Sequence, residues 1–121
     1  MGSEPRLSEF NFAGEFDARG TLMMCFDHQR LVLAVIEREA LGDYFEGSFT
    51  ASECALLVER NSPAFESIIE AKYSANDFLY HEMNGFKSPL VSVSLSDMQR
   101  SGLKFSASVI EMSRNAGFIK P

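Results

Sequence analysis

Residues 21–41, TLMMCFDHQRLVLAVIEREAL, constrain the fold more than any other segment of this chain. Two apolar runs are separated by a short polar break, and helix-forming sequence follows at once. In the first run, Leu22, Met24 and Phe26 alternate with Met23, Cys25 and Asp27. Residues 31–36 are instead apolar on both parities and rich in β-branched residues, as in a strand that is covered on two faces. The segment therefore predicts a β-hairpin with its loop at residues 27–30, followed directly by a helix.

Length and charge limit the number of domains and the kinds of partner that the chain can have. A chain of 121 residues forms one domain, and 45% hydrophobic content is enough to give that domain a core. The net charge of −6 and the pI near 4.9 repel phosphate backbones, and the Lys and Arg residues are scattered. We therefore expect a protein partner, and neither nucleic acid nor membrane.

The remaining composition points to the cytoplasm. The longest apolar run, residues 31–36, is far shorter than the ~20 residues that cross a bilayer. The N-terminus lacks the apolar stretch of a signal peptide. Cys25 and Cys54 lie in predicted regular elements, which suits a reducing compartment without a disulfide. A cytoplasmic protein is expected on these grounds.

Helix signals follow the hairpin. The first helix is predicted from Arg38 to around residues 44–47, where glycines weaken propagation. Thr50 and Glu53 form a capping box, which predicts a second helix that ends near Asn61. Ser62 is the predicted N-cap of a third helix, with a proline in its first turn. The apolar stripe of this third helix is Phe65, Ile68, Ile69 and Tyr73.

Elsewhere the pattern is less regular. A flexible arm is predicted for residues 1–8, a short strand near residues 10–12, and a turn over residues 13–20 in which Gly20 can take a positive φ at little steric cost. Residues 74–88 are predicted to be an irregular connection whose aromatic side chains fold back onto the core. Residues 90–95 alternate as a half-buried strand. Residues 103–112 fit a strand or a helix, and we favour the strand. The expected fold is α+β, with a small antiparallel sheet packed against two or three helices.

Several short motifs resemble a known family. They are FDARG at residues 16–20, the post-hairpin helix with Glu39, Ala40 and Leu41, the pair Asn61 and Tyr73, and the late residues Val93, Leu95 and Asp97. These motifs are similar to those of a family of small bacterial proteins, domain of unknown function fourteen eighty-eight. The resemblance covers residues 16–98 and implies a compact α+β fold, but it supplies no catalytic residue. Pro63 interrupts a helix that is continuous in the family, and residues 99–121 form an extension without a counterpart.

No constellation of reactive side chains predicts an enzyme. Cys25, His28, Cys54 and His81 could in principle bind a metal, but we interpret the cysteines as buried and inert. His28 next to Asp27 fits a solvated hairpin tip better than a catalytic pair, and Glu66 with Glu70 fits solvated charge. Phosphate-binding, dinucleotide-binding and nucleophile motifs do not occur in the sequence. No catalytic residue, cofactor or metal ligand is therefore predicted.

The leading hypothesis is a non-enzymatic protein-interaction or regulatory module. Its surface is predicted from surplus methionine and aromatic residues, which adapt to partner surfaces as well as to cores: Met23, Met24, Phe26, Phe78, Tyr80, Met83 and Phe86. The alternative is a small-molecule binder or simple enzyme with a pocket between sheet and helices, near Cys25, His28 and Tyr73. Because residues 31–36 are apolar on two sides, a second copy could cover one face, so a homodimer is also considered.

Overall fold

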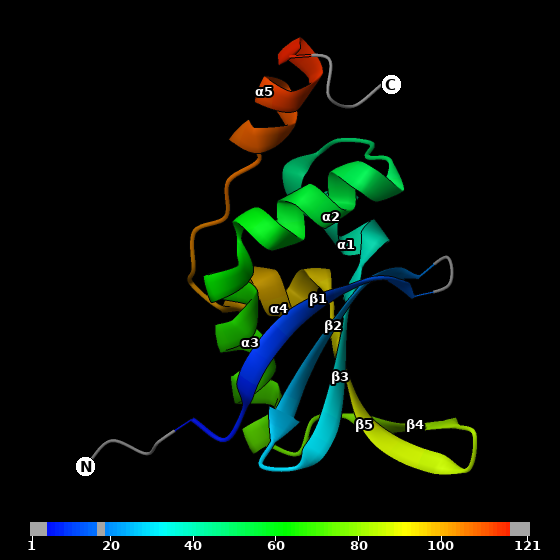
Figure 1. The fold of residues 1–121 in the computed structure, drawn as a ribbon. Coiled ribbons are helices and arrows are strands. Elements are labelled where there is room, and N and C mark those ends of the chain that lie inside the picture. The colour runs from blue at the N-terminus through cyan, green and yellow to red at the C-terminus, as the bar shows by residue number, and fades with distance from the viewer. Residues whose placement is uncertain (1–4, 17–18, 117–121) are drawn as a thin grey trace.

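In the computed structural model, which describes residues 5–16 and 19–116, a twisted sheet packs against helices (Figure 1). The strands of these residues are β1 (Ser8–Phe16), β2 (Gly20–Asp27), β3 (Arg30–Glu37), β4 (Leu79–Met83) and β5 (Phe86–Val93). Their order in the sheet is β1-β2-β3-β5-β4. Neighbouring strands are antiparallel except β3 and β5, which are parallel. The predicted α+β class and the hairpin are confirmed, and the sheet is mixed rather than purely antiparallel.

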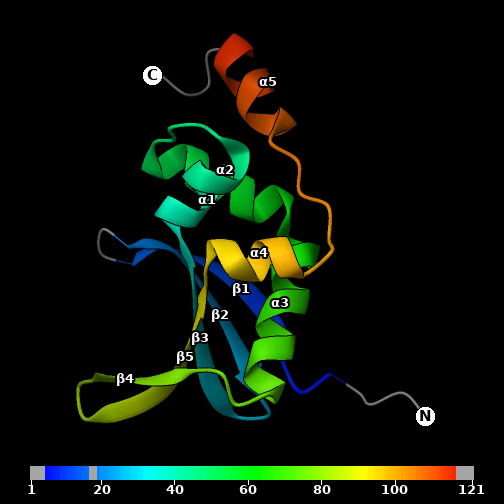
Figure 2. The ribbon, with the colours of Figure 1, turned by 180° about the vertical axis from the view of Figure 1, so that it is seen from behind.

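The helices lie mainly on one side of the sheet, as the view from behind shows (Figure 2). Those of the described residues are α1 (Arg38–Phe45), α2 (Ala51–Arg60), α3 (Ser62–Ser74), α4 (Leu95–Arg100) and α5 (Ser108–Ala116). The helices predicted after the hairpin are confirmed, and the Thr50–Glu53 capping box is present with both of its hydrogen bonds. None of the helices in the described ranges has the length and apolar character needed to cross a bilayer.

The main core lies between the helices and one face of the sheet. Odd-numbered residues of β2 and even-numbered residues of β3 point to this side, as do Val91 and Val93 of β5. The predicted stripe of α3 is buried against them, with Phe65, Ile69 and Tyr73 at most 1% exposed. A Cβ at Gly20 would overlap the carbonyl oxygen of Ile36, so close strand approach, and not the predicted positive φ, requires glycine at this position.

The N-terminal predictions are partly corrected. Leu7 is 5% exposed and its N–H donates to Glu70 Oε1 over 2.8 Å, so residues 5–8 of the predicted arm pack onto the body of the protein. Residues 1–4 of that arm lie outside the described residues. Strand β1 runs to Phe16, which is longer than predicted. Residues 17 and 18 of the predicted turn also lie outside the described residues.

The predicted irregular connection at residues 74–88 contains a hairpin instead. Strands β4 and β5 are joined by Asn84 and Gly85, whose φ values of 53° and 84° are those of a tight hairpin turn. Phe78 does fold back onto the core, where it stacks on Tyr73 with ring centroids 5.1 Å apart. The aromatic side chains beyond it do not, because the hairpin extends away from the body (Figure 1).

Two predictions in the C-terminal third are wrong. The late strand ends at Val93, and residues 95–100 form α4, which a capping box between Ser94 and Asp97 opens. Residues 108–116 are the helix α5, not a strand. The neighbouring residues Val109 and Ile110 are both buried against Leu57, which a helix face allows and an alternating strand does not.

The Glu53 carboxylate, 1% exposed, accepts hydrogen bonds from Arg114 and so ties α5 to the start of α2.

Candidate functional site

One face of the sheet carries a second apolar cluster on the side away from the helices. Cross-strand pairing places even-numbered residues of β2 beside odd-numbered residues of β3, and Leu33 beside Leu90 of β5. We call this surface the open face, and its residues are Leu22, Met24, Phe26, Leu31, Leu33, Val35 and Leu90. Its centre is formed by Leu33, Val35 and Leu90, which are at most 8% exposed. In the described part of the chain, every residue of this cluster comes from a strand, so no helix packs on it.

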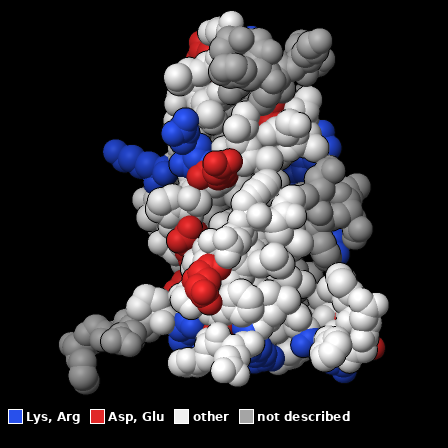
Figure 3. Space-filling model, in the orientation of Figure 1, with Lys and Arg blue, Asp and Glu red and all other residues white. Residues whose placement is uncertain are grey.

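The β4–β5 hairpin extends this apolar surface. Leu79 is paired with Leu90, and Met83 with Phe86, so these side chains share the side of the open face. Leu79 and Phe86 are 78% and 77% exposed, and Met83 is 55% exposed. In Figure 3 the middle of the view, over the strands, is largely free of charged side chains. Within the described residues, the open face and the hairpin therefore form one apolar surface, whose centre is enclosed by its neighbours and whose hairpin end is exposed.

The predicted interaction residues lie in three places: the apolar surface of the open face and hairpin, the opposite side of the hairpin, and the main core. Met24 and Phe26 lie on the open face, and Met83 and Phe86 extend it. Tyr80 lies on the opposite side of the hairpin, where Arg30 donates a 2.8 Å hydrogen bond to its hydroxyl.

Met23 and Phe78 have to be removed from the predicted surface. Met23 is 3% exposed and belongs to the main core, because odd-numbered residues of β2 face the helices. Phe78 is packed against the same core. The prediction missed most of the aliphatic residues of the surface, which are Leu22, Leu31, Leu33, Val35, Leu79 and Leu90. The two-sided apolar run of residues 31–36 was the signal that could have identified those on β3.

One end of the open face is hollow and charged at its rim. Val35 and Ser92, which are paired across β3 and β5, line a depression of about 530 Å³. Its other lining residues are Arg19, Glu37, Arg38 and Glu39. Because these residues carry both signs, the rim has no strong net charge.

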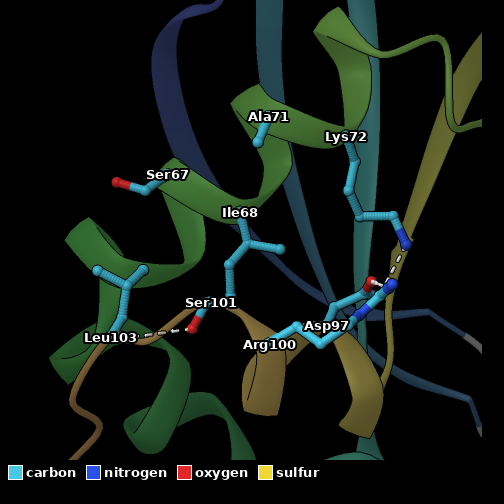
Figure 4. Close-up of a pocket in the computed structure, with 8 residues that line it drawn as sticks. All are labelled: Ser67, Ile68, Ala71, Lys72, Asp97, Arg100, Ser101 and Leu103. Carbon is cyan, nitrogen blue, oxygen red and sulfur yellow. Dashed lines mark hydrogen bonds and ion pairs between the residues drawn. The ribbon is translucent and has the colours of Figure 1, made fainter.

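A second concave site lies between α3 and α4 (Figure 4). It has a volume of about 380 Å³, and α3 contributes Ser67, Ile68, Ala71 and Lys72 to it. At one end, Lys72 Nζ lies 2.6 Å from Asp97 Oδ2 and donates a 2.6 Å hydrogen bond to the carbonyl oxygen of Ser92. Asp97 also accepts from the Ser94 N–H at 2.8 Å and from Arg100 at 3.2 Å.

These contacts explain why Asp97 is ionised and what the Lys72–Asp97 pair does. Burial raises the pKa of this carboxyl, but the hydrogen bonds from Lys72 and Ser94 outweigh burial and hold the pKa below its ordinary value. Lys72 and Asp97 therefore satisfy each other and join α3, α4 and β5. This pocket lies between two helices, whereas the pocket of the alternative hypothesis is expected between sheet and helices.

The candidate reactive residues lie in separate places of the fold. Cys25 is fully buried, and burial, with smaller contributions from Glu70 and Glu66, raises the pKa of its thiol to about 12. The side chain of His28 is 96% exposed at the hairpin turn, with Nε2 3.9 Å from Asp27 Oδ1. Cys54 is buried, and His81 lies on β4. Among the residues that the structure describes, no group of three or more His, Cys, Asp or Glu side chains is arranged to hold a metal ion.

The carboxylates near the pocket predicted around Tyr73 have structural partners. Asp27 Oδ2 accepts hydrogen bonds from the Tyr73 hydroxyl at 2.7 Å and from Arg6 at 3.1 Å, and the tyrosine bond is the main reason that the pKa of Asp27 is lowered. Glu70 accepts from Leu7 and from the Ser74 hydroxyl. Burial raises the pKa of Glu66, so the predicted solvated pair is partly enclosed.

Comparisons with known protein families, with curated proteins and with solved structures find no match for this chain. The function therefore has to be inferred from the chemistry of the surfaces described above.

Proposed function

We propose that this protein is a non-enzymatic interaction or regulatory module that binds another protein chain through its open face. One observation carries the proposal: in the described ranges, no helix packs on the apolar face formed by β2, β3 and β5, and this face continues onto the exposed residues of the β4–β5 hairpin. Contiguous apolar surface of this kind on a folded protein marks a binding site. The hydrophobic effect then supplies the binding free energy, because the partner removes this surface from water.

The chemistry of the face favours a protein partner. None of the seven residues of the open face is charged, so it offers no contact to a phosphate backbone. The net charge of −6 disfavours nucleic acid and anionic membrane surfaces further. An apolar centre with a charged rim, like the one at Arg19 and Glu37, is the usual anatomy of a protein interface.

Family and location are proposed on narrower grounds. The motifs at residues 16–20, 39–41 and 61–73 support membership of the bacterial family fourteen eighty-eight. Cys25 and Cys54 are buried and not joined in a disulfide, which supports a reducing compartment, and hence the cytoplasm.

Small-molecule binding is the second candidate function. It is favoured by the pocket between α3 and α4, whose volume of about 380 Å³ lies within the range of ligand sites. The pocket combines an apolar wall, which includes Ile68 and Leu103, with the Lys72–Asp97 pair at one end. A small ligand with an apolar body and one polar group would fit this chemistry.

Capture experiments test the leading proposal. The immobilised protein is exposed to a lysate of its source organism in parallel with Met24→Asp, Phe86→Asp and the control Glu59→Lys, whose side chain is exposed on α2. Circular dichroism first confirms that each variant is folded. We expect the same protein to be retained by the wild type and the control but lost from Met24→Asp and Phe86→Asp. Retention that is equal for all four proteins would contradict a role for the open face.

A further inference from the structure

We propose that the occupant of the open face is a second copy of this chain, packed sheet against sheet about a two-fold axis. The inference rests on the proposed docking role of the open face and names the partner that it takes. In such a dimer the residues at the centre of the face, Leu33, Val35 and Leu90, become the middle of a shared core. Sheets pack face to face about 10 Å apart in this way in β-sandwiches.

The exposed apolar area lies mainly on the hairpin. Leu33, Val35 and Leu90 at the centre of the open face are at most 8% exposed, whereas the hairpin residues Leu79, Met83 and Phe86 are 78%, 55% and 77% exposed. An aromatic side chain buries about 150–250 Å², so Phe86 contributes well over 100 Å² by itself. The other two hairpin residues and the partly exposed residues of β2 and β3 add to this, so two copies together approach the roughly 1,200 Å² at which specific interfaces begin.

The distribution of charge favours a copy of the same chain. Two chains that each carry a net charge of −6 repel each other at most orientations. The open face avoids this repulsion because its seven residues are uncharged. At its rim, Arg19 and Arg38 lie with Glu37 and Glu39, so two copies can place residues of opposite charge against each other there. Apolar centres of this kind are typical of homodimers, whose interfaces resemble a core cut in two.

The β4–β5 hairpin gives the second argument. It extends from the body as a two-stranded ribbon (Figure 1) and carries Leu79, Met83 and Phe86, which are all more than half exposed. Two-stranded ribbons are marginally stable in water unless another layer packs on them. All three side chains point to the side of the open face, so the hairpins of two copies can each pack along the sheet of the other.

The experiment measures mass by light scattering across a dilution series. The wild type is compared with Met24→Asp and Phe86→Asp. The matched control is Tyr80→Asp, which alters an aromatic residue of the same hairpin, 57% exposed, on its opposite side. Each protein is checked for folding by circular dichroism and titrated with the dye 1-anilinonaphthalene-8-sulfonate, which reports exposed apolar surface.

We expect the wild type and Tyr80→Asp to have twice the 13.5 kDa mass of one chain, and Met24→Asp and Phe86→Asp each to dimerise at least about tenfold more weakly. A wild type of single mass at micromolar concentration would overturn the dimer. If dye binding to that monomer is strong and is lost in Met24→Asp, the open face remains a docking site for a different protein. A dimer that neither variant weakens, with unchanged dye binding, would overturn both proposals.

Discussion

Asn61 holds the C-terminal extension to the helices, and its replacement by alanine should loosen that extension. The side chain is 7% exposed and lies at the junction between α2 and α3. Its Nδ2 donates to the carbonyl oxygens of Leu57 at 2.7 Å and Ser106 at 2.9 Å. Its Oδ1 accepts from the Ser106 N–H at 2.8 Å. The two bonds to Ser106 join residues 45 positions apart and fix the segment that leads into α5.

The loss of stability depends on which polar groups remain without a hydrogen-bond partner after the substitution. A neutral hydrogen bond contributes about 0.5–1.5 kcal/mol net, and more when a buried group is left without a partner. The Leu57 carbonyl keeps its bond from the Asn61 N–H, at 3.1 Å, and Ser106 is exposed, so water can reach its freed groups. We therefore expect Asn61→Ala to lower the free energy of unfolding by about 2 kcal/mol. This is well below the loss of three hydrogen bonds at about 1.5 kcal/mol each, because not all of the freed groups stay without a partner. For a domain of this size, a loss of about 2 kcal/mol corresponds to a Tm lower by roughly 6–10 °C.

Urea unfolding followed by circular dichroism measures this loss, and limited trypsin digestion shows where it acts. Lys104 is exposed in the segment between α4 and α5, so its cleavage should become faster in Asn61→Ala. Gln99→Ala is the matched control, because it removes an exposed amide from α4. A destabilisation below about 0.5 kcal/mol with an unchanged rate of cleavage at Lys104 would show that Asn61 does not hold the extension.

Three further predictions follow from buried groups. Phe65→Ala empties a fully buried site and should cost about 3–5 kcal/mol in urea unfolding, whereas Met112→Ala, at an exposed position, should cost less than about 0.5 kcal/mol. The hydrogen bonds from Arg114 lower the pKa of Glu53 below its ordinary 4.5, so the ionised carboxylate stabilises the fold fully above that pH, and this stabilisation is lost as the pH falls through the folded-state pKa. Between pH 7 and pH 3, the Tm of Glu53→Gln should therefore fall less steeply than that of the wild type. Equal slopes for the two proteins would contradict this. Burial raises the pKa of Cys25 to about 12, so a disulfide reagent at pH 8 should modify this thiol only after unfolding, and rapid labelling of the native protein would refute its burial.

Local signals predicted the first half of the fold well. The hairpin was specified by two apolar runs around a polar break, and α2 by the Thr50–Glu53 capping box. Both signals depend on neighbouring residues and are satisfied within the segment itself. The predicted N-cap of α3 is the informative exception. Ser62 is the first residue of that helix, and the cap position is occupied by Asn61, whose side chain bonds Ser106 instead of capping the helix.

The errors in the second half arose where two local signals competed. Asn84 and Gly85 between apolar residues are a strong hairpin signal, but polar residues nearby favoured an irregular loop. Val93 and Leu95 continue an alternation, although Ser94 and Asp97 already form the capping box of α4. For residues 103–112 the decision depends on tertiary packing, because Val109 and Ile110 bury themselves only once Leu57 is in place.

The position of the interaction surface could be predicted only in part. Alternation indicates which residues of β2 share a face, but it does not say which face the helices will cover. Met23 and Met24 are chemically identical neighbours, and one lies in the core while the other lies on the open face. Leu33 and Val35 look like ordinary core residues in the sequence, and their separation from the main core appears only in three dimensions.

The connectivity explains why one face is left without helices. Strands β1, β2 and β3 are antiparallel neighbours and need no crossover, so no helix is inserted between them in the chain. A parallel pair needs a crossover, and the connection between β3 and β5 carries α1, α2 and α3, which pack on one face. Helix α4 follows β5 and contributes Met98 to the same core, while α5 packs on α2. Yet Leu33 and Val35, on the open face, are as apolar as Val32, Ala34 and Ile36, which face the helices. A strand with this pattern is typical of a sheet that is covered on both faces, and the helices of the described residues cover only one of them, which is why we propose a second copy of the chain as the other layer.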